Sequence, residues 1–142
     1  MNKQNNIPTK RVLVIEDNND VTLIVCAALK MKGYAASTAT DGFEGFYKAR
    51  REQPDLIILD LNLPRLPGEE VCRAIREDND PKFARTPIVM LTAKVKESDR
   101  IVGKVIGADV YLTKPFEIED IWSEAERLLA DDRNNHSKGG SS

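Results

Sequence analysis

Five polar side chains stand at the ends of apolar runs that are typical of strands. In chain order these side chains are Glu16, Asp17, Asp60, Thr92 and Lys114. The runs before them are VLVI, DLIIL, PIVML and a weaker stretch that ends at residue 113. Because the carboxyl ends of parallel strands meet at one edge of a sheet, we expect these side chains to lie close together.

The chemistry of this set is that of phosphoryl transfer. Three carboxylates held close together repel one another unless a cation joins them. Carboxylate oxygens suit Mg²⁺, which keeps several waters and is often shared with a phosphate. A lysine adds a point charge for phosphate oxygens, and an aspartate can itself be the nucleophile. Each residue alone is more often a helix cap, a turn residue or a surface lysine, so the combination carries the prediction.

The elements that must position these residues alternate along the chain. Strands are predicted at residues 11–16, 55–60 and 86–92, and more weakly at 35–38 and 108–112. Near-continuous apolar strands are typical of a parallel sheet that is covered on both faces. Helical patterns occupy residues 20–32, 41–52, 67–78, 96–106 and 115–130.

Local signals support several helix ends. Asp41 and Glu44 have the spacing of a capping box, and Gly33 stands where a helix would end. Strand and helix therefore alternate five times, which predicts an α/β fold with a doubly wound, five-stranded parallel sheet and five helices on both faces.

Composition excludes several other classes of protein. A length of 142 residues fits one domain, and 21 basic against 23 acidic residues give no basic surface for nucleic acid. No apolar run is long enough to span a bilayer, and the N-terminus lacks the apolar core of a secretory signal, so the cytoplasm is the expected compartment. The chain has no P-loop, dinucleotide fingerprint or GxSxG elbow, which removes support for nucleotide-dependent and acyl-transfer chemistry.

Cys26 and Cys72 both lie among apolar residues on helical patterns and are predicted to be buried hydrophobes rather than a redox pair. Residues 1–9 are expected to be an N-terminal extension. Residues 131–142, which include the only histidine, His136, read as a disordered tail or a remnant of cloning.

The folded part, residues 10–130, resembles the receiver domain of bacterial two-component response regulators. The resemblance rests on VLVIED (12–17), DLIILDLNLPRLPG (55–68), PIVMLTA (87–93) and GADVYLTKPF (107–116). It implies a flavodoxin-like sheet with strand order 2-1-3-4-5.

The resemblance also implies a metal site. Asp60 would be the phosphoacceptor, and Asp17 and Asp60 would bind Mg²⁺ directly, with Mn²⁺ as a substitute. The main-chain carbonyl of Asn62 would be a third protein ligand, and Glu16 would act through a bound water.

The remaining implied roles concern catalysis and switching. Thr92 and Lys114 would contact the phosphoryl group, Thr92 and Tyr111 would form the switch, and the Lys114–Pro115 peptide would be cis. The chain would then catalyse its own phosphorylation and dephosphorylation, although it would act chiefly as a signalling switch.

The implied partners are proteins. A histidine kinase or a histidine phosphotransfer protein would supply the phosphoryl group. An output protein would bind the face formed by residues 96–106, 108–112 and 115–130, through which a homodimer is also conceivable. No direct contact with nucleic acid or with a membrane is expected.

Three other interpretations stay open at the level of sequence. The chain could be the excised receiver of a larger regulator or hybrid kinase, or an unphosphorylated pseudo-receiver that serves as a scaffold. It could also be a phosphatase with an aspartyl nucleophile, although no substrate-cap segment is visible.

Overall fold

The computed structural model describes residues 8–93 and 107–130. The predicted helix at 96–106, most of the predicted extension at 1–9, and the tail with His136 lie outside the described residues. None of the helices in the described part of the chain is long and apolar enough to cross a bilayer.

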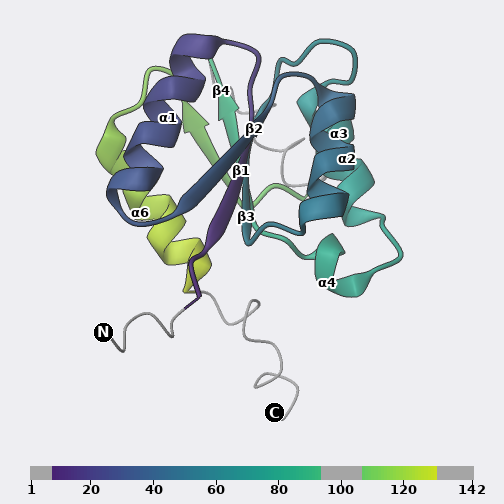
Figure 1. Ribbon diagram of the computed structural model, residues 1–142. Helices are drawn as coiled ribbons and strands as arrows, with labels where there is room; N and C mark the ends of the chain where they lie inside the picture. The colour runs from purple at the N-terminus through teal and green to yellow at the C-terminus, as the bar shows by residue number, and fades with distance from the viewer. Residues whose placement is uncertain (1–7, 94–106, 131–142) are drawn as a thin grey trace.

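A five-stranded parallel sheet forms the centre of the molecule (Figure 1). Its strands are β1 (Arg11–Ile15), β2 (Ala35–Ala39), β3 (Leu56–Asp60), β4 (Ile88–Thr92) and β5 (Val110–Thr113). They are arranged in the order β2-β1-β3-β4-β5, and every neighbouring pair is parallel. The predicted fold class and strand order are therefore confirmed, and the predicted strand ends differ from the observed ones by one or two residues.

Helices cover both faces of this sheet (Figure 1). They are α1 (Asn19–Met31), α2 (Gly42–Glu52), α3 (Gly68–Arg76), α4 (Pro81–Ala84) and α6 (Ile118–Leu129). Helices α1 and α6 lie side by side on one face, and α2 and α3 lie together on the other. The four-residue helix α4 was not predicted, since one turn is too short to show a hydrophobic period.

Side-chain caps fix where the helices begin. Asp41 accepts a hydrogen bond from the amide of Glu44, as the capping-box pattern predicts, but Glu44 accepts from the amide of Thr40 rather than that of Asp41. Helix α6 begins at Ile118 and not at 115, because Glu117 and Asp120 form the capping box there. The predicted helix at 115–130 therefore began three residues too early.

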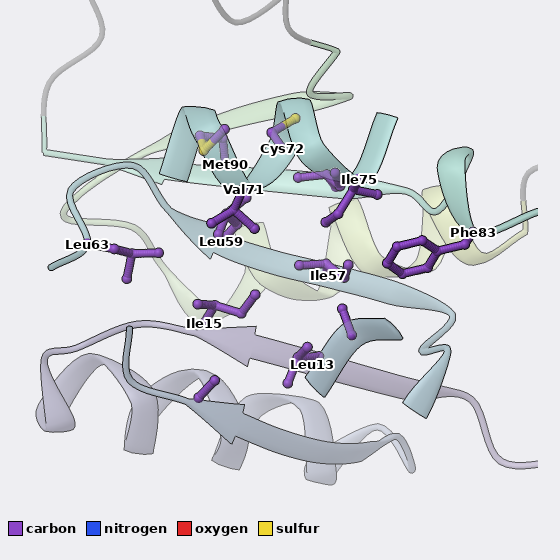
Figure 2. Packing of buried hydrophobic residues seen from close by; sticks show 13 residues of the cluster. Leu13, Ile15, Ile57, Leu59, Leu63, Val71, Cys72, Ile75, Phe83 and Met90 are labelled. Carbon is purple, nitrogen blue, oxygen red and sulfur yellow. The ribbon is translucent and has the colours of Figure 1, made fainter. Parts of the chain in front are cut away.

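The core consists of two clusters, one on each side of the sheet. Alternating side chains of β1 and β3 point to opposite faces. The α2–α3 cluster contains Leu13, Ile15, Ile57, Leu59 and the side chains that Figure 2 shows around them. The α1–α6 cluster contains Val12, Val14, Leu56, Ile58 and the buried residues of α1 and α6.

The two cysteines behave as the apolar pattern predicts. Cys72 is fully buried in the α2–α3 cluster, and burial raises the pKa of its thiol to about 11. Cys26 is half-buried against the opposite cluster, and burial raises the pKa of its thiol as well. Neither cysteine forms a disulfide, and the predicted burial is confirmed for Cys72 but only in part for Cys26.

Candidate functional site

Three carboxylates meet where β1 and β3 end. Glu16, Asp17 and Asp60 each place one carboxylate oxygen within 4.8 Å of the others. The register of the sheet explains this meeting, because Ile15 pairs with Leu59 and the next residue of each strand is therefore level. Glu16 and Asp60 are only 1% and 3% exposed, whereas Asp17 is exposed. The predicted gathering of acidic side chains is thus present.

Backbone hydrogen bonds hold the two buried carboxylates in place. The amide of Glu16 donates to the carbonyl of Ala39 at 3.0 Å, which extends the pairing of β1 with β2 past the end of the strand. The amide of Asn18 donates to Glu16 Oε2 at 3.1 Å, and the amide of Asn62 donates to Asp60 Oδ1 at 3.2 Å. One oxygen of each buried carboxylate, Glu16 Oε2 and Asp60 Oδ1, is therefore fixed by a backbone amide of the following loop.

Lys114 brings the positive charge of the site. Its Nζ lies 3.0 Å from Glu16 Oε1 and 3.5 Å from Asp60 Oδ1. Its backbone amide donates to the carbonyl of Thr92 at 2.6 Å, so the end of β5 is tied to the end of β4. The Lys114–Pro115 peptide is cis, as the resemblance implied.

The electrostatics of the cluster favour an added cation. Burial raises the pKa of the Glu16 carboxyl, and the charge of Asp60 acts in the same direction. Lys114 and the amide of Asn18 oppose this rise. The buried Glu16 Oε1 lies 3.0 Å from the Lys114 ammonium. The three carboxylates are a set of oxygen donors that fits a hard divalent cation such as Mg²⁺, and the single charge of Lys114 offsets their repulsion only in part.

The other predicted site residues lie nearby but contribute differently. Thr92 is buried at the end of β4, one position beyond Leu91, which pairs with Asp60. Tyr111 is half-buried on β5 and packs against the α2–α3 cluster. Asn62 is exposed on the loop that follows β3. The implied roles of these three residues stay predictions.

An apolar hollow beside Lys114 was not foreseen from the sequence. It has a volume of about 360 Å³ and is lined by Val21, Ile24, Lys114, Pro115 and Phe116. Ile24 is 51% exposed, whereas Val25, Ala28 and Leu29 of the same helix are buried. A hydrophobic period does not distinguish a core side chain from one that borders an open hollow, so only the tertiary structure reveals this feature.

Comparison with known proteins places this geometry in a family. The model of the response regulator receiver domain family matches residues 12–126. The chain is 40% identical over 120 residues to the alkaline phosphatase synthesis transcriptional regulatory protein PhoP of Bacillus subtilis, covering 84% of this chain and 48% of that protein. It is 42% identical over 119 residues to the DNA-binding dual master transcriptional regulator RpaA of Synechocystis, covering 84% and 48%.

Solved structures agree with the sequence comparisons. The chemotaxis response regulator CheY4 of Vibrio cholerae superposes with a TM-score of 0.78 at 35% identity, over 85% of this chain and 99% of that one. The receiver domain of the sensor histidine kinase PA1611 of Pseudomonas aeruginosa, solved with a magnesium ion in its active-site cleft, has a TM-score of 0.79 at 30% identity, over 87% and 100%. The chain spans about half the length of the curated relatives that it matches.

Proposed function

The chain belongs to the response regulator receiver domain family, and from this premise we propose that Asp60 accepts a phosphoryl group from a phosphohistidine donor in a Mg²⁺-dependent reaction. The observation that carries the proposal is the buried Asp60 carboxylate, which lies within reach of two further carboxylates and of the Lys114 ammonium. This set joins a nucleophile to the groups that neutralise a phosphoryl group.

Four residues would hold the metal. Asp17, Asp60 and the main-chain carbonyl of Asn62 are the proposed direct ligands, and Glu16 is the proposed partner of a metal-bound water. Mg²⁺ bound there would offset the negative charge of the carboxylates and of the incoming phosphoryl oxygens. The magnesium ion in the related receiver of PA1611 supports this assignment, and Mn²⁺ is proposed as a substitute because it accepts the same oxygen ligands.

The chain's own residues account for the chemical step. A carboxylate oxygen of Asp60 attacks the phosphorus and forms the new O–P bond. The N–P bond to the donor imidazole breaks, and the imidazole nitrogen keeps the electron pair. Lys114 and the hydroxyl of Thr92 bind phosphoryl oxygens and stabilise their charge. Water later hydrolyses the aspartyl phosphate, which releases inorganic phosphate and restores Asp60.

The same step would operate a switch. A phosphoryl group on Asp60 adds negative charge beside the buried hydroxyl of Thr92 and so favours a state in which Thr92 binds it. Tyr111 would respond by turning inward. The proposed readout is the face that contains β5 and α6, through which an output protein or a second copy would bind; the helix predicted at 96–106, which lies outside the described residues, is expected to belong to it.

The length of the relatives favours a role within a longer regulator. PhoP and RpaA are named as transcriptional and DNA-binding regulators, and the chain matches 48% of each. We therefore propose that the receiver controls an output function outside residues 10–130. The expected absence of direct contact with nucleic acid concerns residues 10–130 alone. Histidine kinases or phosphotransfer proteins are the proposed donors, and the cytoplasm is the proposed compartment.

Intact mass spectrometry tests the chemical proposal. The protein is incubated with phosphoramidate and Mg²⁺, and parallel samples contain EDTA or the Asp60→Ala variant. We expect a single phosphoryl group on the wild type and none in either parallel sample. Asp20→Ala is the matched control, because it removes an exposed aspartate on α1 and should leave phosphorylation intact. No phosphoryl gain by a folded wild type would instead favour the scaffold interpretation.

A further inference from the structure

The loop at 61–67, directly after Asp60, is held by its own apolar side chains. Leu63 is 8% exposed and packs in the α2–α3 cluster, and Leu61 and Leu66 pack partly against the same cluster. Figure 2 shows Leu63 on this loop, at the Ile15 end of the row of buried side chains. At the end of the loop, the amide of Gly68 donates to the carbonyl of Leu61 at 2.9 Å.

The first residue of α2 lies directly against this loop. The amide of Gly42 approaches the carbonyl of Pro64 at 3.4 Å. A Cβ added at Gly42 would overlap the carbonyl oxygen of Leu66 and lie 2.6 Å from Leu66 Cβ. Because the overlapping carbonyl is backbone, the loop or the helix would have to move, so this approach requires glycine.

The next residue of α2 makes a second contact with the loop. The guanidinium carbon of Arg65 lies 5.4 Å from the centroid of the Phe43 ring, within the range of a cation–π interaction. Arg65 has a φ of 70°, in the left-handed region that residues other than glycine seldom adopt. Such a backbone persists only where its surroundings hold it, and the Phe43 contact is one of the interactions that do so.

We propose that the N-terminus of α2 is a positioning element for the metal site, acting through Gly42 and Phe43. These residues hold the loop at 61–67 so that Asn62 stays at the Asp60 carboxylate, where its amide donates at 3.2 Å. The inference rests on the proposed function, in which the carbonyl of Asn62 binds Mg²⁺. Neither α2 residue touches the metal; their effect reaches it through the loop.

The central test compares two alanine variants of the same helix. Gly42→Ala pushes directly on the backbone of the loop, whereas the methyl group of Gly45→Ala meets the side chain of Ile15 in the core as its nearest neighbour, 2.7 Å from Cδ1. Both exchanges add the same methyl group to the same helix, and the gain in helix propensity is smaller at Gly42, the first residue of α2, than at Gly45. Mg²⁺ affinity is measured by isothermal titration calorimetry, and folding is checked by thermal unfolding in EDTA.

We expect Gly42→Ala to weaken Mg²⁺ binding by about tenfold, as is usual when the support of a metal ligand is disturbed. Gly45→Ala should stay within about twofold of the wild type, even where it lowers the melting temperature more. Equal weakening in both variants would mean that general packing, and not the loop, sets the affinity, and the inference would be overturned.

A milder pair of variants covers the case in which Gly42→Ala fails to fold. Phe43→Leu removes the contact with Arg65, and Tyr47→Leu removes the ring of another exposed aromatic of α2. Weaker Mg²⁺ binding by Phe43→Leu alone supports the inference. Wild-type affinity in both Gly42→Ala and Phe43→Leu overturns it and leaves the proposed function standing, whereas a wild type that binds no Mg²⁺ overturns both.

Discussion

Asp60 stands in a cluster of three carboxylates whose repulsion is offset by one ammonium, that of Lys114. Its buried carboxylate lies beside two others, and Lys114 is already closer to Glu16. We expect Asp60→Asn, which removes one negative charge, to raise the free energy of unfolding in EDTA by about 1 kcal/mol. In saturating Mg²⁺ the wild type should be the more stable of the two proteins, because it gains stability from Mg²⁺ binding that the variant lacks.

Urea unfolding in EDTA and in Mg²⁺ measures both effects. Asp55→Asn is the control, because Asp55 precedes β3 at the opposite end of the strand and accepts from the amide of Arg11. This control should lose stability in both buffers. A less stable Asp60→Asn in EDTA would contradict the view that repulsion dominates the cation-free site.

Cys72 gives the protein a dependence on alkaline pH. Its folded-state pKa of about 11 exceeds the ordinary value of 9.0, so the unfolded chain loses the thiol proton first as pH rises. The free energy of unfolding should therefore fall from about pH 9 to about pH 11, by about 2 to 3 kcal/mol in total.

Comparison of the wild type with Cys72→Ala isolates this effect, because tyrosines and lysines titrate equally in both. In urea unfolding at pH 8 and pH 10.5, the wild type should lose about 2 kcal/mol more than the variant. Equal losses of unfolding free energy in the two proteins would show that the Cys72 thiol does not contribute to the pH dependence of stability.

At the scale of the elements, the side chain of Trp122 adds a hydrogen bond to the apolar packing between α1 and α6. The indole Nε1 of Trp122 on α6 donates to the carbonyl of Ala28 on α1 at 2.7 Å, and Lys32 Nζ lies 4.6 Å from the ring centroid. Trp122→Phe keeps an aromatic ring but loses the donor. We expect a loss of about 1 kcal/mol in the free energy of unfolding, measured by far-UV circular dichroism in urea.

A second variant separates the hydrogen bond from the cation–π contact. Lys32→Gln removes only the charge above the ring and should cost about 0.5 kcal/mol. If Lys32→Gln costs as much as Trp122→Phe, the hydrogen bond between the helices is not the main link.

The elements also show what the sequence could and could not predict. A strand such as DLIILD can be recognised because four apolar residues in a row are followed by a carboxylate, and this pattern located Glu16, Asp17 and Asp60. Lys114 was found as the polar residue that follows a weaker strand pattern. The switch and ligand roles came from the resemblance and stay predictions.

Contacts between distant segments were missed. The approach of Gly42 to Leu66 and the exposure of Ile24 depend on how segments far apart in the chain pack together, which no local pattern encodes. The short helix α4 was missed for a different reason, since a single turn buries one large side chain, Phe83, and shows no period.

At the scale of the whole molecule, the same sheet contributes side chains to two hydrophobic clusters, one on each face. The central strands β1 and β3 send alternate side chains into the α2–α3 cluster and into the α1–α6 cluster. Both clusters depend on side chains of β1 and β3. The two faces of the sheet should therefore unfold together in a single transition. Trp122 packs against the α1–α6 cluster, and its fluorescence therefore reports on that face alone.

A small change on the opposite face tests this cooperativity. Ile75 on α3 is fully buried in the α2–α3 cluster, and Ile75→Val should cost about 1 kcal/mol. If the sheet couples the faces, the urea midpoint of Trp122 fluorescence shifts by the same amount as that of far-UV circular dichroism. Val25→Ala, on the Trp122 side, should then also shift both probes together. If Val25→Ala shifts the urea midpoint of Trp122 fluorescence and Ile75→Val does not, the two faces unfold separately. In that case a loss of packing at α3 does not destabilise the packing of α6 across the sheet.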